Sequence, residues 1–336
     1  MTTGPGIPDD SRFDVTAIGN AIVDVLSQAE DKFLKEQQLN KGTMSLIQGD
    51  DADRLYSLMG PGVEVSGGSA ANTAAGIAGL GGRVAFIGKV ADDQLGEVFA
   101  HDIRAAGVTY DTAPLNGSLS TARCLIFVTP DSQRTMQTFL GAGTELGPED
   151  IREEWIAASK VVFIEGYLWD APRAKEGILR AAQIAREAGR KVSFTLSDPF
   201  AVDRHREEFR DLVENHVDIL FANEVEIQSL YEVDDFDAAL QRVRGVCEVA
   251  ALTRSAKGSV VVSTDEVHVI DAEPDVKVID TTGAGDAYAA GFLYAYTHGW
   301  PLQACGRLGG KLAAEIISHY GARAEADLKQ LAAGMR

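Results

Sequence analysis

The feature that most constrains this chain is a glycine-containing stretch, D-T-T-G-A-G-D-A-Y-A-A-G-F, at residues 280–292. The alternating V-K-V-I at 276–279 predicts a short strand before it, and Ala287 to Tyr296 predicts a helix after it. Small residues at 283–285 leave backbone N–H groups free to face a ligand at the positive end of that helix. Such a turn is an anion site suited to phosphate, with Asp286 beside it in the first helical turn.

The same stretch also has a simpler interpretation. An acidic residue in the first turn of a helix is often only a capping arrangement. The stretch is not a dinucleotide fingerprint, because Tyr288 stands where G-x-G-x-x-G needs its third glycine. No Walker A sequence, G-x-x-x-x-G-K-[ST], occurs in the chain. The residues alone therefore leave both a cap and an anion site open.

Taken as a whole, the string resembles the second signature of the ribokinase-like (PfkB) family of sugar and nucleoside kinases. The resemblance implies that Asp286 is the general base that takes the proton from the substrate hydroxyl. It also implies that the backbone of Gly283, Ala284 and Gly285 stabilises charge on the transferring phosphoryl group. These roles suit phosphoryl transfer, which depends on positioning and electrostatic stabilisation, with a base to steer the nucleophile.

The composition fits one large α/β unit without a membrane or nucleic-acid partner. The 336 residues are 45% hydrophobic and 24% charged, and their net charge of −19 argues against a nucleic-acid or acidic-membrane binder. No apolar run approaches the roughly 20 residues of a membrane span, and the N-terminus lacks a secretory pattern. Cys124, Cys247 and Cys305 match no disulfide or zinc spacing, so we expect buried thiols and a cytoplasmic location. Residues 1–12 are expected to form a disordered tail, and residues 13–336 a single kinase domain.

Regular alternation of strands and helices from Gly147 onward predicts a parallel sheet. V-V-F-I at 161–164 and D-I-L-F at 218–221 are continuous apolar strands, as expected when helices cover both faces. Right-handed crossovers would bring the carboxyl ends of these strands to one edge, where ligands collect in open α/β sheets. The predicted fold is α/β, a ribokinase-like three-layer α/β/α core of Rossmann-like type.

A hairpin at Thr121–Thr129 and Arg134–Leu140 lies between βα units but is not followed by helices. It predicts a small β-sheet lid over the open end of the sheet, shared with short strands at Met44–Ile47 and Val63–Val65. The lid segments are expected at about residues 20–66 and 110–141.

Two polar residues follow the first predicted strand, Phe13–Gly19, at the same edge. Asn20 could be a turn residue, and Asp24 a solvated strand residue. They also resemble the asparagine and aspartate with which adenosine-kinase-like members of the family bind the ribose hydroxyls. The resemblance therefore implies that these two side chains bind the substrate.

A glycine pair followed by a helix of tiny residues comes next. Gly67, Gly68 and Asn72 have the G-G-x-x-x-N spacing that resembles the family's first signature. In the family the glycines leave room for the sugar and the asparagine amide binds its hydroxyls. A tightly packed core helix is the alternative, and we expect most of residues 74–80 to be that.

Arg134 and Tyr167 each have two interpretations. Arg134 is either an exposed hairpin residue or, by resemblance, the lid arginine that reaches the phosphates. Tyr167 follows the strand at 161–164, so it is either a core aromatic residue or a platform for a base. The resemblance to adenosine-kinase-like members implies the platform, since they place an aromatic residue against the adenine ring.

Asn223 and Glu226 stand three residues apart at a helix start, which fits a capping box. They also resemble the family's N-x-x-E motif, whose glutamate orders Mg²⁺ and its waters around the phosphates of ATP. Glu226 would then act on the metal through water. Thr253 and Gly258 match family residues that line the nucleotide, although Ser255 stands where many members have glycine.

The resulting hypothesis is ATP- and Mg²⁺-dependent phosphorylation of the 5′-hydroxyl of adenosine, giving AMP and ADP. In some relatives K⁺ binds near the position of Asp280. The alternatives are a ribokinase, fructokinase or ketodeoxygluconate kinase, or a nucleoside-binding relative that has lost catalysis. Intact Asp286, Asn223 and Glu226 argue against lost catalysis, and the missing dinucleotide fingerprint argues against hydride transfer. The sequence does not distinguish a monomer from a homodimer.

Overall fold

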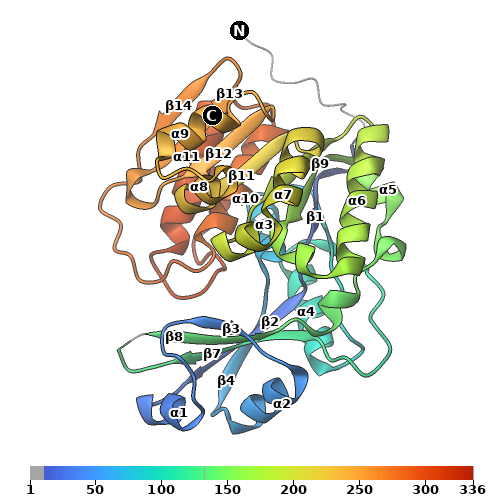
Figure 1. Cartoon of the computed structure of the whole chain (residues 1–336), viewed down its shortest axis with the longest axis vertical. Helices are drawn as coiled ribbons and strands as arrows, with labels where there is room; N and C mark the ends of the chain where they lie inside the picture. The colour runs from blue at the N-terminus through green and yellow to red at the C-terminus, as the bar shows by residue number, and fades with distance from the viewer. Residues whose placement is uncertain (1–10, 132, 336) are drawn as a thin grey trace.

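The computed structural model describes residues 11–131 and 133–335, and their strands form two sheets (Figure 1). The expected tail lies outside the described residues over positions 1–10. The large sheet has nine strands in the order β14-β13-β12-β11-β10-β9-β1-β5-β6. Its strands are β1 (Phe13–Ile18), β5 (Val84–Ile87), β6 (Thr109–Tyr110), β9 (Ser159–Glu165), β10 (Lys191–Thr195), β11 (Ile219–Asn223), β12 (Val249–Thr253), β13 (Ser259–Ser263) and β14 (Val267–Ile270).

Helices cover both faces of this sheet, so the predicted three-layer α/β/α core is confirmed. Alternate residues of β9 show the two faces, because Phe163 belongs to one apolar core while Val162 and Ile164 belong to the other. The first core is covered by α3 (Ser69–Gly79), α4 (Gln94–Ala105), α10 (Ala284–Thr297), α11 (Leu302–Ile316) and α12 (Leu328–Ala332). The second is covered by α5 (Glu153–Ala157), α6 (Pro172–Glu187), α7 (Pro199–His216), α8 (Glu224–Tyr231) and α9 (Phe236–Val243).

The strands from β6 to β12 pair in parallel, and only β13 and β14 are antiparallel. Parallel pairing brings the carboxyl ends of these strands to one edge of the sheet, as predicted. The short helices η1 (Gly141–Glu145), η2 (Pro148–Asp150), η3 (Gly166–Asp170) and η4 (Ser255–Lys257) lie in connecting segments.

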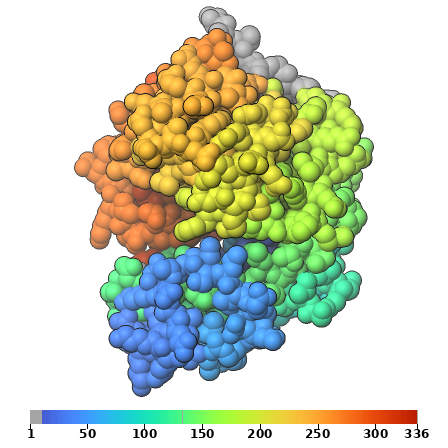
Figure 2. Space-filling model, in the orientation of Figure 1, coloured from blue at the N-terminus to red at the C-terminus, as the bar shows by residue number. Residues whose placement is uncertain are grey.

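The five-stranded sheet, in the order β3-β8-β7-β2-β4, is the predicted lid and forms the lower lobe in Figures 1 and 2. Its elements are β2 (Ile22–Gln28), α1 (Asp31–Glu36), β3 (Met44–Leu46), α2 (Gly49–Leu58), β4 (Gly62–Gly67), β7 (Ala122–Val128) and β8 (Arg134–Phe139). Strand β2, between β7 and β4, was not predicted, because only three residues separate it from β1. Those three residues carry the chain from the carboxyl edge of the core directly into the lid, so the lid lies over that edge.

The strand predicted at 276–279 is wrong. The chain has no regular structure there, and Val278 and Ile279 are 58% and 40% exposed. The backbone N–H of Ile279 donates to the carbonyl oxygen of Ile317, just after α11, at 2.8 Å. An alternating apolar pattern forms a strand only where a neighbouring strand can pair with it, and here the neighbour is a helix end.

The three cysteines are free and buried, as expected. Among the described residues, no helix has the length and apolar character needed to cross a membrane.

Candidate active site

The loop at 283–285 begins helix α10, where the N–H of Ala284 donates to the carbonyl oxygen of Thr281 at 3.2 Å and the next two N–H groups are free. Gly283 is the N-cap residue with φ +78°, and a Cβ placed on it would lie 2.6 Å from the Cβ of Ala322. A Cβ on Gly285 would meet no atom within 4 Å, so this residue faces open space. Within the described chain, the backbone N–H groups of Gly285 and Asp286 have no acceptor. These two donors lie at the positive end of a 14-residue helix, which favours an anion there.

Asp286 lies against the start of helix α3, which holds both of its carboxylate oxygens. Ser69 Oγ donates to Oδ1 at 2.7 Å, and Asn72 Nδ2 donates to Oδ2 at 2.9 Å. Burial raises the pKa of Asp286, while these two hydrogen bonds and the charge of Arg323 act in the opposite direction. The helices approach closely because α3 is built of small residues, and a Cβ on Gly76 would lie 2.7 Å from the Cβ of Ala290.

The glycine pair of β4 and α3 lies directly on the two polar residues that follow β1. A Cβ on Gly67 would lie 2.5 Å from Asp24 Oδ2, and one on Gly68 would lie 2.3 Å from the carbonyl oxygen of Asn20. Gly68 also has φ +96°, a left-handed conformation that favours glycine. Burial raises the pKa of Asp24 to about 7, against the charges of Arg323 and Arg134. Asp24 is therefore not the solvated strand residue that the sequence allowed.

Glu165, at the end of β9, connects the two halves of this cradle and was not predicted. Its Oε1 accepts from the backbone N–H and the Nδ2 of Asn20, both at 2.7 Å, and its Oε2 accepts from the N–H of Ala70 at 2.8 Å. Glu165 is fully buried, and burial raises its pKa to about 7. The signal in the sequence was an acidic residue that ends an otherwise apolar strand. Glu165 thus fixes the orientation of Asn20.

Arg134 joins the lid to the segment that precedes the 283–285 loop. Its Nη1 lies 2.7 Å from Asp280 Oδ2, and its side chain is only 10% exposed, so it is not the exposed hairpin residue of the alternative. Asp280 Oδ2 also accepts from the N–H of Gly321 at 2.9 Å, while Oδ1 accepts from Thr282 Oγ1 at 2.8 Å. A monovalent cation at Asp280 would have to compete with Arg134. That cation and the contact of Arg134 with phosphate stay predictions.

Asn223 and Glu226 form the predicted capping box at the start of α8. The two oxygens of Glu226 accept from the backbone N–H of Asn223 at 2.9 Å and from its Nδ2 at 2.6 Å, and Asn223 Oδ1 accepts from the N–H of Glu226 at 2.9 Å. Burial raises the pKa of Glu226 to about 7. With both oxygens bonded, Glu226 fits a role toward Mg²⁺ through water. Over residues 11–131 and 133–335, no group of three His, Cys, Asp or Glu side chains could hold a metal ion.

Thr253 and Gly258 bound the turn between β12 and β13, beside this capping box. Thr253 is the register partner of Asn223 on the adjacent strand. Gly258 has φ +80°, and a Cβ on it would lie 2.0 Å from the carbonyl oxygen of Ile270. Ser255 has φ +51°, the left-handed conformation that glycine adopts most easily.

Tyr167 lies in η3, where the loop after β10 holds it. Its hydroxyl donates to the carbonyl oxygen of Ser197 at 3.3 Å, and the N–H of Gly166 donates to Ser197 Oγ at 2.8 Å. Three residues after Ser197, Phe200 is 71% exposed in the first turn of α7. This second aromatic residue was not predicted, although D-P-F at a helix start was visible in the sequence. Both aromatic residues lie in the segments that follow β9 and β10 at the carboxyl edge of the sheet.

The predicted residues therefore fall into two groups at this edge, and no hydrogen bond joins the groups in the described part of the chain. One surrounds Asp286 and contains Asn20, Asp24, Gly67, Gly68 and Asn72. The other lies along the ends of β11 and β12 and contains Asn223, Glu226, Thr253 and Gly258.

Three carboxylates with raised pKa values should make the unliganded protein less stable as the pH rises toward neutrality. In the folded protein the pKa values of Asp24, Glu165 and Glu226 are each raised by burial to about 7, whereas in an unfolded chain such groups titrate near pH 4 (about 3.9 for Asp and 4.3 for Glu). Between these values the folded state binds more protons than the unfolded state, so the free energy of unfolding falls as pH rises. We expect a higher Tm at about pH 5.5 than at about pH 8 in thermal unfolding of the apo protein.

Asp24→Asn removes one of the three titrating groups and should reduce that pH dependence. The exposed Asp265→Asn should leave it unchanged. A Tm that rises from about pH 5.5 to about pH 8 would contradict the buried, destabilised state of these carboxylates.

Comparisons with known proteins agree with this geometry. The pfkB family carbohydrate kinase profile matches residues 51–329. The structure of adenosine kinase from Sinorhizobium meliloti is similar, with 53% identity and a TM-score of 0.89, covering 96% of this chain and 99% of that chain. A probable sugar kinase protein from Rhizobium etli CFN 42 has 52% identity and a TM-score of 0.90, covering 97% and 100%. The adenosine kinase of Saccharomyces cerevisiae is 26% identical over 330 residues, covering 91% of this chain and 95% of that protein.

Proposed function

The chain belongs to the pfkB family of carbohydrate kinases, which transfer a phosphoryl group to a hydroxyl, and we propose that it phosphorylates the 5′-hydroxyl of adenosine with ATP. One observation carries the proposal: a half-buried carboxylate, Asp286, lies between free N–H groups at a helix start and a polar cradle at the carboxyl edge of the sheet. The similarity to adenosine kinase from Sinorhizobium meliloti supports the choice of acceptor. We further propose a single cytoplasmic kinase domain over residues 13–336.

In this mechanism Asp286 accepts the proton of the acceptor hydroxyl. Ser69 and Asn72 orient its carboxylate, and each of its oxygens retains a lone pair for the substrate. The raised pKa of Asp286 makes it a stronger base than an exposed carboxylate, provided that it is ionised at the working pH. The free N–H groups of Gly285 and Asp286 would stabilise charge on the transferring group.

The ribose would bind between the lid and the core. Asn20 and Asp24 offer polar atoms from the segment that enters the lid, and Gly67 and Gly68 let the β4–α3 turn lie directly against them. Arg134 links the lid to Asp280 beside the loop, so lid closure and phosphate binding would be coupled through this arginine. A closed lid would exclude water and so limit ATP hydrolysis.

The second group of residues is the proposed nucleotide side of the site. Thr253 and Gly258 would line ATP, and Asn223 and Glu226 would order the waters of Mg²⁺. When bound, Mg²⁺ neutralises charge on the phosphates. Its requirement is measured as loss of turnover when a chelator is added.

The test of the proposal is ADP release from MgATP with adenosine, inosine, ribose, fructose and ketodeoxygluconate as candidate acceptors. Turnover with adenosine that yields AMP supports the proposal, and turnover only with a free sugar overturns it. The similarity to a probable sugar kinase keeps a sugar acceptor as the second candidate. Silence with every acceptor, together with adenosine binding, would indicate a relative that has lost catalysis.

Tyr167 separates the two candidates. If its ring stacks on adenine, Tyr167→Ala should raise the KM for adenosine by about 5- to 100-fold, since stacking on an aromatic side chain contributes about 1–3 kcal/mol. Tyr167→Phe keeps the ring and loses only the hydrogen bond to Ser197, so its KM should stay close to that of the wild type. An unchanged KM for adenosine in Tyr167→Ala would remove Tyr167 from the base site.

A further inference from the structure

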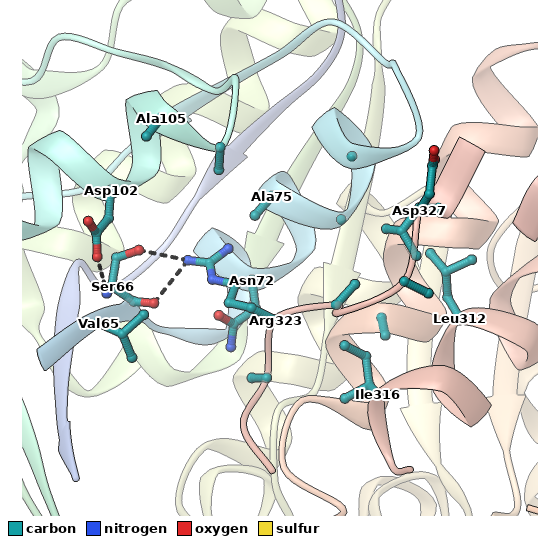
Figure 3. A pocket seen from close by; sticks show the side chains of 18 residues that line it. Val65, Ser66, Asn72, Ala75, Asp102, Ala105, Leu312, Ile316, Arg323 and Asp327 are labelled. Carbon is teal, nitrogen blue, oxygen red and sulfur yellow. Dashed lines mark hydrogen bonds between the residues drawn. The ribbon is translucent and has the colours of Figure 1, made fainter. Parts of the chain in front are cut away.

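Arg323 is a half-buried arginine beside the proposed site, in the segment that follows α11, and the mechanism above does not use it. Its Nη1 donates to the carbonyl oxygen of Ala71 at 3.0 Å. Its Nη2 donates to the carbonyl oxygen and the Oγ of Ser66, both at 3.1 Å (Figure 3). Ser66 immediately precedes the Gly67–Gly68 pair, and Ala71 follows the pair in the first turn of α3. Arg323 therefore holds β4 and α3 together across the pair that lies on Asp24 and Asn20.

The chain on both sides of Arg323 is held by hydrogen bonds and contacts, so the position of its backbone is fixed. On one side the N–H of Gly321 donates to Asp280 Oδ2 at 2.9 Å, and Ala322 contacts the Gly283 turn. On the other side the N–H groups of Glu325 and Ala326 both donate to Glu315 Oε1 at 2.9 Å. The same segment thus contacts both the anion loop and the proposed sugar cradle.

We propose that Arg323 is a positioning residue for phosphoryl transfer: it fastens the β4–α3 turn that shapes the substrate cradle, and its positive charge favours the ionised forms of Asp24 and Asp286. This inference rests on the proposed function, because it assigns Asp286 as the base. Arg323 makes no ion pair with a described carboxylate and touches no reacting atom, so it acts through the turn and through its electric field.

The electrostatics of the site agree with this role. Burial raises the pKa of both Asp24 and Asp286, and the positive charge of Arg323 opposes both shifts. The charge persists, since burial lowers the pKa of Arg323 only to about 10. The other titratable groups that face these carboxylates are Glu165 and Tyr167, which face Asp286, and Arg134 and Cys124, which face Asp24. Without Arg323 the negative charges of Asp24 and Asp286 would repel each other with less compensation. Both carboxylates would then be protonated more readily, and a protonated Asp286 could not act as the base.

A cavity beside Arg323 makes it possible to test this role by removing the side chain and adding a small replacement from solution. It has a volume of about 540 Å³ and is lined by the small residues of α3, by α4 and by the segment after α11 (Figure 3). Arg323, Ser66 and Asn72 form part of its wall. Truncating Arg323 would extend this cavity to the carbonyl oxygens of Ala71 and Ser66. A guanidinium ion from solution could then take the place of the missing side chain.

The test compares Arg323→Ala, Arg323→Lys and the control Arg307→Ala, an exposed arginine on α11. Arg323→Ala should lower kcat by at least about tenfold, with a deficit roughly tenfold larger at about pH 6 than at about pH 9. Millimolar guanidinium should restore part of the loss. Arg323→Lys keeps the charge without the planar fork, so its acid limb should match the wild type while its acceptor KM rises. Arg307→Ala should change nothing.

A pH-independent loss in Arg323→Ala that guanidinium does not relieve would overturn the proposal in favour of a purely structural role, and wild-type activity would overturn it outright. The series uses whichever acceptor the wild type phosphorylates, so absence of adenosine turnover in the wild type counts against the proposed function alone. An NMR titration of carboxyl-labelled aspartates needs no turnover. The midpoints of Asp24 and Asp286 should rise in Arg323→Ala, and unchanged midpoints would contradict the electrostatic role. If Arg323→Ala does not fold, Arg323→Gln takes its place in both measurements.

Discussion

Asp286→Asn should lower kcat by roughly 10²–10⁴-fold or more while adenosine still binds, because it removes the proposed general base and leaves the cradle in place. Asparagine has the same shape, so the contacts of Ser69 and Asn72 with the side chain remain geometrically possible. Removing a half-buried carboxylate whose pKa is raised should also increase stability above neutral pH. Steady-state ADP release, adenosine titration calorimetry and Tm measured on one preparation check the three effects together.

The matched control is Asp265→Asn, the same change in an exposed turn between β13 and β14. Its kcat should equal that of the wild type. Turnover within about threefold of the wild type in Asp286→Asn would exclude the base role, because the loss of a general base costs about 100-fold at least. A joint loss of turnover and adenosine binding would place Asp286 in the binding cradle instead.

The fold followed from the sequence where each pattern had a local cause. Strands such as β9 and β11 are apolar on both faces because helices cover both faces, so their pattern is unambiguous. The errors occurred where contacts with distant parts of the chain determine the local structure. Strand β2 was overlooked because the three residues at 19–21 redirect the chain into another sheet, and the strand predicted at 276–279 has no partner strand.

The same distinction between local and distant causes applies to the residues of the site. Asp286 and the two glycine motifs were predicted because several residues at fixed spacing carry each of them. Glu165 and Arg323 are single residues whose partners lie far along the chain: Glu165 binds Asn20 across 145 positions, and Arg323 binds Ser66 across 257. A one-dimensional pattern contains no trace of such contacts, since the fold alone brings the partners together. The residues that support the site through contacts with distant parts of the chain therefore could not be predicted from the sequence.

Gly285→Ala should separate stability from activity at the anion loop. Because a Cβ on Gly285 meets no protein atom within 4 Å, the change fits the folded chain, and alanine is favoured over glycine in a helix by about 1 kcal/mol. Tm should therefore stay constant or rise. The methyl group would nevertheless occupy the space that the phosphoryl group needs beside the free N–H groups. We expect kcat/KM to fall by roughly 10²–10³-fold, comparable to the loss of an oxyanion donor.

Two glycines of the same chain complete the comparison. Gly310→Ala, inside α11, also meets no atom within 4 Å and lies away from the loop, so both stability and turnover should be retained. Gly283→Ala should instead destabilise the fold by at least about 1–2 kcal/mol, because its φ of +78° disfavours alanine and the new methyl group would meet Ala322. Thermal unfolding and ADP release measured on all three variants test whether the transferring phosphate lies beside Gly285. If Gly285→Ala and Gly310→Ala have equal activity, the transferring phosphate does not pass over Gly285, and the helix start is a cap without a catalytic role.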